Sequence, residues 1–228
     1  MVAARTNQPK DGVVLLHGIS RTFRSMNKMQ HALEAAGFST LNVDYASRRK
    51  RLEELAEDIH SAITDFSGTV DGATHFVCHS MGGLLARAYL TTHPPKRLGR
   101  VVMLGTPNGG SEIADHLKNF VGYRMFFGPA GQQLVTIRDE ATEALLRPTA
   151  YPVGIIAGNR SIDPISSSFF LAGPNDGRVT IAGTKIEGMS DHIVVNASHP
   201  WLIRHLPAIE QTIAFLRQGH FNNNDRNA

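Results

Sequence analysis

Ser80 stands in a sequence context that could make its hydroxyl a nucleophile. It follows an apolar run at residues 76–79 and precedes two glycines, Gly82 and Gly83. A serine between an apolar strand and a glycine-rich helix start sits on a sharp turn that lifts its hydroxyl above the sheet. That turn needs small residues two positions before and after the serine. Gly82 is one of them. Cys78 stands where glycine is usual, but cysteine is also small, so we expect the turn to form.

A serine hydroxyl is a poor nucleophile at neutral pH and needs a general base. Eleven histidines are available. Active sites of parallel sheets assemble at the carboxyl ends of the strands. His199 follows an apolar run at residues 192–197 and is therefore predicted at such an end. His192 begins the same run and is the alternative base.

An acid is expected to orient the histidine and to stabilise its charged form. It should follow the strand predicted at residues 151–157, and both Asp163 and Asp176 do so. Asp176 lies in a turn signal, Asn-Asp-Gly, that precedes a short apolar run. Both Asp176 and Asp163 remain candidates on this evidence.

Alternating strands and helices are predicted to position these side chains. Short apolar runs indicate strands at residues 12–18, 39–45, 74–79, 100–104, 151–157 and 192–197. Helical spacing of apolar residues indicates helices at residues 25–36, 52–66, 82–90 and 207–217. This alternation predicts an α/β fold, a mostly parallel sheet with helices on both faces, in one domain over residues 1–228.

Two segments depart from that alternation. Residues 111–148 form an apolar insertion after the fourth predicted strand, rich in aromatic residues around position 123. We expect a cap or lid over the active end of the sheet, with one ordinary covering helix as the alternative. Residues 219–228 are polar and are predicted to be a disordered tail.

The composition excludes several classes of function. The 228 residues carry a formal net charge of only +3, which gives no reason to expect nucleic-acid binding. The basic run at residues 48–51 is followed by glutamates and is interpreted as a solvated helix start. One cysteine permits no intrachain disulfide. Without a signal peptide or an apolar run long enough for a transmembrane segment, we expect a cytoplasmic protein.

The sequence also offers no pattern for a cofactor. No cysteine and histidine spacing suggests a metal site. The glycine-rich stretch at residues 105–110 lacks the lysine of a phosphate-binding loop, so we interpret it as one wall of the active cleft. We expect no cofactor and no metal.

Four motifs together resemble the α/β-hydrolase family, specifically its compact lipase-like and esterase-like members. They are Leu-His-Gly-Ile at 16–19, Cys-His-Ser-Met-Gly-Gly at 78–83, Asn-Asp-Gly-Arg-Val at 175–179 and Ser-His at 198–199. The resemblance implies the α/β-hydrolase fold and a triad in the chain order Ser80, Asp176, His199. It also implies an oxyanion hole formed by the backbone N–H groups of Ile19 and Met81.

The activity implied is hydrolysis of a small-molecule or lipid ester of a carboxylic acid through an acyl-enzyme. The same residues could serve a thioesterase, an amidase or an acyltransferase, because one fold hosts many reactions. The rival of another class is a catalytically silent lipid-binding protein. Transient contact with a lipid or membrane surface is a further expectation from the aromatic residues of the insertion.

Overall fold

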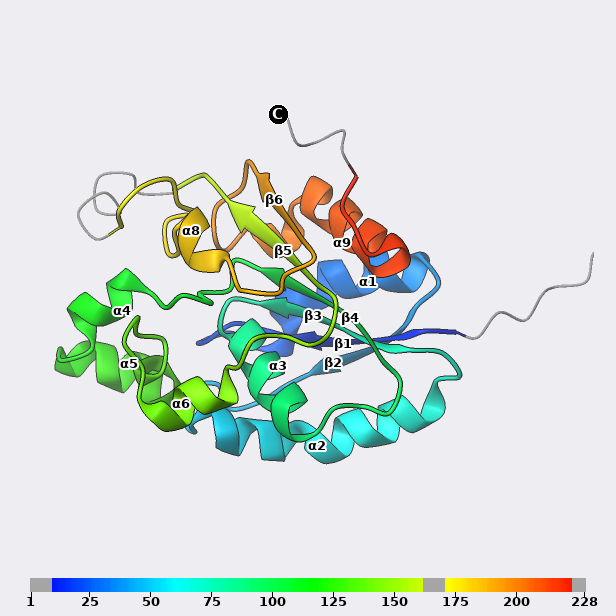
Figure 1. Cartoon of the computed structure of the whole chain (residues 1–228), viewed down its shortest axis with the longest axis horizontal. Coiled ribbons are helices and arrows are strands. Elements are labelled where there is room, and N and C mark those ends of the chain that lie inside the picture. Colours follow the sequence, from blue (N-terminus) through cyan, green and yellow to red (C-terminus); the bar gives the residue numbers. More distant parts are fainter. Residues whose placement is uncertain (1–9, 162–170, 223–228) are drawn as a thin grey trace, which may run out of the picture.

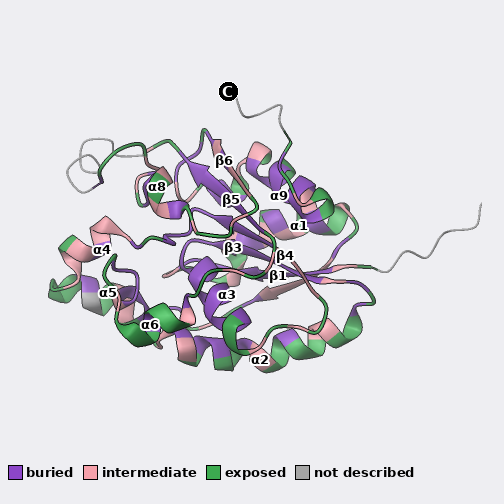
Figure 2. Cartoon of the chain, viewed as in Figure 1, coloured by how far each residue is buried: buried purple, intermediate pink, exposed green. Residues whose placement is uncertain are grey.

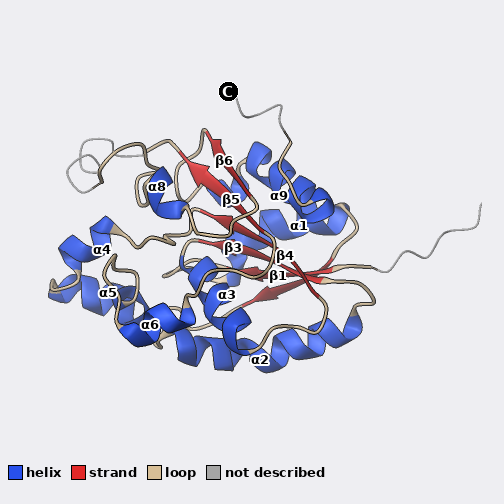
Figure 3. Ribbon diagram, in the orientation of Figure 1, coloured by secondary structure: helices blue, strands red, loops and turns tan. Residues whose placement is uncertain are grey.

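The computed structural model describes residues 10–161 and 171–222. Its centre is a sheet in which every paired strand runs parallel to its neighbours. The strands are β1 (Gly12–Leu16), β2 (Ser39–Val43), β3 (Thr74–His79), β4 (Leu98–Leu104), β5 (Val153–Gly158) and β6 (Asp191–Val195), in the order β2-β1-β3-β4-β5-β6. Figures 1 and 3 show this sheet between two layers of helices. The predicted fold class is confirmed.

Helices cover both faces of the sheet because successive strand residues point to opposite sides. In β1, Val14 and Leu16 face one apolar core, which is covered by α2 (Leu52–Thr69) and α3 (Met81–Thr92). Val13 and Leu15 face the other core, covered by α1 (Asn27–Ala35) and α9 (Leu206–Gln218). Burial on both faces explains why the central strands are largely apolar, and Figure 2 shows β1, β3 and β5 as buried.

The insertion folds into three helices rather than one covering helix. They are α4 (Glu112–Leu117), α5 (Val121–Gln132) and α6 (Glu140–Leu145). They lie beyond one end of the strands, and α6 is the one next to α3 (Figure 1). Gly128 breaks the regular geometry of α5 with a φ of 63°. An added Cβ there would lie 1.7 Å from the carbonyl oxygen of Arg48, so only glycine allows α5 to pack so closely on that loop.

The remaining elements are short: η1 (Phe23–Met26), α8 (Ile181–Thr184) and η2 (Leu202–Arg204). The predicted tail at residues 219–228 begins too early. Phe221 is fully buried, with its ring 5.1 Å from that of Phe215, and its N–H donates to Asp191. One aromatic residue thus fixes residues 219–222 against the second core, and residues 223–228 lie outside the described residues.

Candidate active site

Ser80 occupies the turn between β3 and α3 in an unusual backbone conformation. Its φ is 54° and its ψ is −126°. Among the described residues only Ser20 shares a positive φ without being glycine. Such a conformation costs on the order of 1–3 kcal/mol and persists only where surrounding contacts hold it. Here the Ser80 N–H donates to the carbonyl oxygen of Leu104, and the Ser80 carbonyl accepts from Gly83.

Small neighbours make this turn possible. A Cβ added to Gly82 would lie 2.5 Å from the carbonyl oxygens of both Leu16 and His17, because α3 begins against the end of β1. The side chain of Cys78 lies in the core beneath α3 and is fully buried. Burial raises the pKa of the Cys78 thiol, so it is not poised as a nucleophile.

The structure brings Ser80, His199 and Asp176 into one hydrogen-bonded relay. His199 Nε2 lies 2.9 Å from Ser80 Oγ, and His199 Nδ1 lies 2.7 Å from Asp176 Oδ2. With the Nδ1 proton directed at the carboxylate, Nε2 is left to accept the serine proton. The backbone N–H of His199 also donates to the carbonyl oxygen of Asp176, at 2.9 Å.

The loop around Asp176 fixes the carboxylate. Asp176 Oδ1 accepts hydrogen bonds from the backbone N–H groups of Arg178 (2.9 Å) and Val179 (2.8 Å). The side chain is only 1% exposed, so these donors replace water. One carboxylate oxygen is therefore anchored to its own turn, and the other is free to orient the histidine.

The alternative base, His192, does not join the relay. His192 lies at the start of β6, and its Nε2 is 3.1 Å from Thr184 Oγ1. Burial lowers the pKa of His192. Asp163 lies outside the described residues.

His79 is a neighbour of the relay that the sequence analysis does not identify. Its Nε2–H donates to the carbonyl oxygen of His199 at 2.9 Å, and the two rings are 4.9 Å apart. Burial, together with the nearby His199, holds the pKa of His79 well below its usual range, so the ring is neutral. It braces the backbone of His199. No spacing signals this role, since His79 and His199 lie 120 residues apart.

Gly105 lies against the hydrogen bond between Asp176 and His199. Its φ is 58°, and an added Cβ would lie 3.1 Å from both Asp176 Oδ2 and His199 Nδ1. Its N–H donates to Ile156 of β5, which holds the loop in place. The glycine-rich stretch thus does more than line a cleft: its first glycine leaves room for the relay.

The two residues predicted as oxyanion donors belong to segments that meet at Ser80. Met81 opens α3, where a backbone N–H has no intrahelical acceptor and the helix dipole is positive. Ile19 follows Gly18, whose added Cβ would lie 3.2 Å from Ser80 Cβ. Among the described backbone pairs outside the regular elements, neither N–H donates a hydrogen bond.

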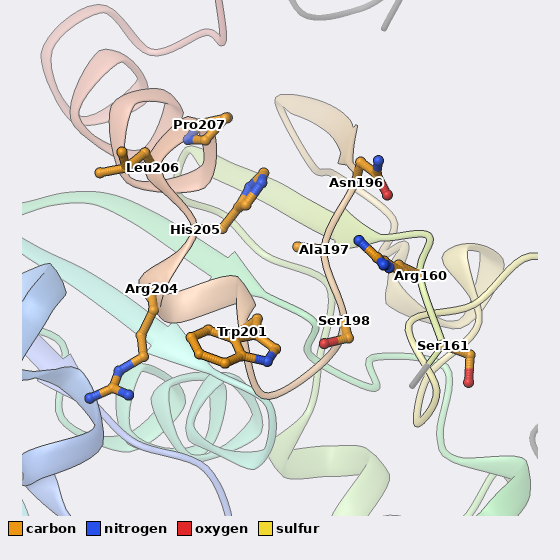
Figure 4. A pocket seen from close by; sticks show the side chains of 10 residues that line it. All are labelled: Arg160, Ser161, Asn196, Ala197, Ser198, Trp201, Arg204, His205, Leu206 and Pro207. Carbon is orange, nitrogen blue, oxygen red and sulfur yellow. The ribbon is translucent and has the colours of Figure 1, made fainter. Parts of the chain in front are cut away.

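A cavity of about 420 Å³ opens at Ser80 and His199. Its apolar wall comes largely from the insertion, with Tyr123, Phe127 and Leu134 among the side chains that line it. A larger hollow of about 730 Å³, shown in Figure 4, lies between the start of α9 and the loop before His199. It contains no member of the relay, so the smaller cavity is the candidate substrate site.

The described part of the chain contains neither a cluster of metal-binding side chains nor a membrane-spanning helix. No three side chains of the kind that bind metals come together there. No helix in residues 10–161 and 171–222 combines the length and apolar character needed to cross a bilayer.

Comparison with known proteins agrees with the fold. The sequence model of the "Alpha/beta hydrolase family" matches residues 13–227, so the chain belongs to the α/β-hydrolase family. Among solved structures it is similar to the mature lipase BlEst2 of Bacillus licheniformis, with a TM-score of 0.75, 20% identity and 93% of each chain covered. It also resembles the metagenomic carboxyl esterase MGS0156, with a TM-score of 0.66, 18% identity, and 84% of this chain and 65% of that one covered.

One protein with a similar sequence matches a smaller part of this chain than these structures do. A lysosomal thioesterase of Xenopus laevis, PPT2-B, is 26% identical over 101 residues, which are 42% of this chain and 35% of that protein.

Proposed function

We propose that this chain is a serine hydrolase that cleaves carboxylic esters through an acyl-enzyme. The observation that carries the proposal is the relay from Ser80 Oγ through His199 to Asp176, at 2.9 and 2.7 Å. These distances lie within the reach that proton transfer to a general base requires. The order of the three residues along the chain is also that of the family.

In the proposed reaction Ser80 Oγ attacks the ester carbonyl and its proton passes to His199 Nε2. The N–H groups of Ile19 and Met81 stabilise the oxyanion that develops, while Asp176 stabilises the imidazolium. His199 then gives the proton to the departing alcohol. A water molecule, activated by His199 in the same way, attacks the acyl-enzyme and releases the acid.

The cavity supports an apolar acyl group. Aromatic and aliphatic side chains of the insertion line it, and its volume of about 420 Å³ is that of a small-ligand site. We propose that residues 111–148 act as a cap that binds this acyl group. Phe120 and Met125 are 67% and 80% exposed on the same segment, which supports transient contact with a lipid surface.

A second candidate is a thioesterase, favoured by the partial likeness to the Xenopus laevis protein. The relay suits both reactions, because a thioester is attacked at the same carbonyl carbon. Matched oxygen esters and thioesters of one acyl group would distinguish the two.

The test is a panel of p-nitrophenyl esters of increasing chain length, assayed with the wild-type chain and with Ser80→Ala. We expect turnover of apolar acyl esters by the wild type and none above background by the variant. A folded wild-type protein that hydrolyses no ester or thioester would overturn the proposal, and so would a Ser80→Ala variant that turns over normally.

A further inference from the structure

Two arginines share the cavity with the proposed nucleophile. Arg21 and Arg178 both line it, and their side chains are exposed. Among the described residues that form the lining there is no aspartate and no glutamate. Neither arginine forms a salt bridge with any described carboxylate. Two positively charged residues therefore line the substrate site without a salt-bridge partner among the described residues.

Hydrogen bonds fix the backbones of both arginines close to the relay. The Arg178 N–H donates to Asp176 Oδ1 at 2.9 Å, and the Arg21 N–H donates to the carbonyl oxygen of Gly18 at 3.3 Å. Arg21 lies two residues after Ile19, and its charge helps to lower the pKa of His79 next to Ser80. The two guanidinium groups thus come from the loops beside the proposed oxyanion hole and the proposed acid.

Further arginines line the surface next to Arg21. Two adjoining hollows, of about 400 and 610 Å³, are both lined by Ser20 and Arg21. Arg24 and Arg204 line the first, and Arg48 and Arg49 line the second. Asp44 is the one carboxylate among the residues that line either hollow. Arginines that line the cavity and both hollows suit an anion that reaches beyond the cavity.

The acyl group and the anion must belong to different parts of one substrate. The apolar wall contributed by the insertion suits the acyl chain, which leaves the arginines to the leaving group. Guanidinium groups bind phosphate through paired, charge-assisted hydrogen bonds. We infer that this site cleaves esters or thioesters whose leaving group carries phosphate, bound by Arg21 and Arg178. This inference rests on the proposed function.

The test compares substrates that share an acyl group and differ in phosphate. One pair is 1-octanoylglycerol and its 3-phosphate; the other is the octanoyl thioester of N-acetylcysteamine and octanoyl-coenzyme A. We expect kcat/KM to be at least about tenfold higher for the phosphate member of one pair or both, mainly through KM. The preference should shrink as NaCl rises from about 0.05 to about 0.5 M. A preference in the first pair identifies glycerophosphate as the leaving group. A preference in the second identifies a leaving group with a nucleotide, as in coenzyme A.

Arg21→Gln/Arg178→Gln should bring the ratio of the two kcat/KM values close to one. The control is Lys96→Gln, which removes an exposed charge just before the amino end of β4, away from the carboxyl ends where the site lies, and should keep the wild-type ratio. General damage to the site would lower both rates together and preserve the ratio. The inference is overturned if the wild type shows no phosphate preference in either pair, or if the double variant retains it. Failure to hydrolyse any of the four substrates would instead contradict the proposed function.

Discussion

Replacing Gly105 by alanine is expected to disturb the relay without altering any of its members. The new Cβ would lie 3.1 Å from Asp176 Oδ2 and His199 Nδ1, and 2.8 Å from Leu202 Cδ1. Ordinary contacts begin at 3.4 Å, so these groups must retreat by a few tenths of an ångström. Because a misplacement of about 1 Å can cost about a hundredfold in rate, we predict a roughly five- to twentyfold loss of kcat/KM.

The same change also strains the backbone. Alanine at a φ of 58° costs roughly 1–2 kcal/mol relative to a right-handed conformation. Gly37→Ala is the matched control: its φ is 96°, and an added Cβ would meet nothing within 4 Å. Urea denaturation should show both variants destabilised, while p-nitrophenyl ester assays should show only Gly105→Ala impaired. Wild-type activity in Gly105→Ala, or an equal loss in both variants, would refute the steric argument.

Further predictions concern the histidines and the cysteine. His199→Ala should lose activity on the order of 10⁴-fold, and His192→Ala should be only mildly impaired; an inactive His192→Ala beside an active His199→Ala, both folded by circular dichroism, would reverse the assignment. Cys78→Ala should keep most activity and lose about 1 kcal/mol of stability through a small cavity; an inactive but folded variant would reveal a chemical role for the thiol. Burial lowers the pKa of His17 and His79 from 6.5, so the unfolded state binds more protons below that pH. The free energy of unfolding should therefore fall on acidification below about pH 6.5, by at most about 1.4 kcal/mol per pH unit for each histidine; urea titrations that show no such fall would contradict this.

Local patterns were enough to predict the strands and the turn at Ser80. A strand buried on both faces must be continuously apolar, and a sharp turn needs a small residue such as Gly82, so both leave a mark in the sequence. The preference for His199 over His192 followed from one further rule, that side chains at the carboxyl ends of parallel strands meet.

Contacts between distant segments produce no local sequence pattern and could not be predicted in this way. The approach of Gly105 to the relay depends on how β4 and β5 sit side by side, and the bond from His79 to His199 depends on the path of the loop after β6. The burial of Phe221 similarly follows from tertiary packing against α9, where composition alone predicts a tail. Periodicity does not separate the three helices of the insertion, because α4 and α6 span only six residues each and Gly128 interrupts the regular geometry of α5.

The central claim is that Ser80 is a nucleophile activated by His199, and covalent labelling tests it most directly. The folded chain would be treated with a fluorophosphonate and its intact mass and labelled peptide measured by mass spectrometry. The account predicts one adduct, on Ser80, absent from Ser80→Ala and strongly slowed in His199→Ala. No adduct on the folded wild type, as expected of a silent lipid-binding protein, or an adduct at another residue that persists in Ser80→Ala, would contradict it.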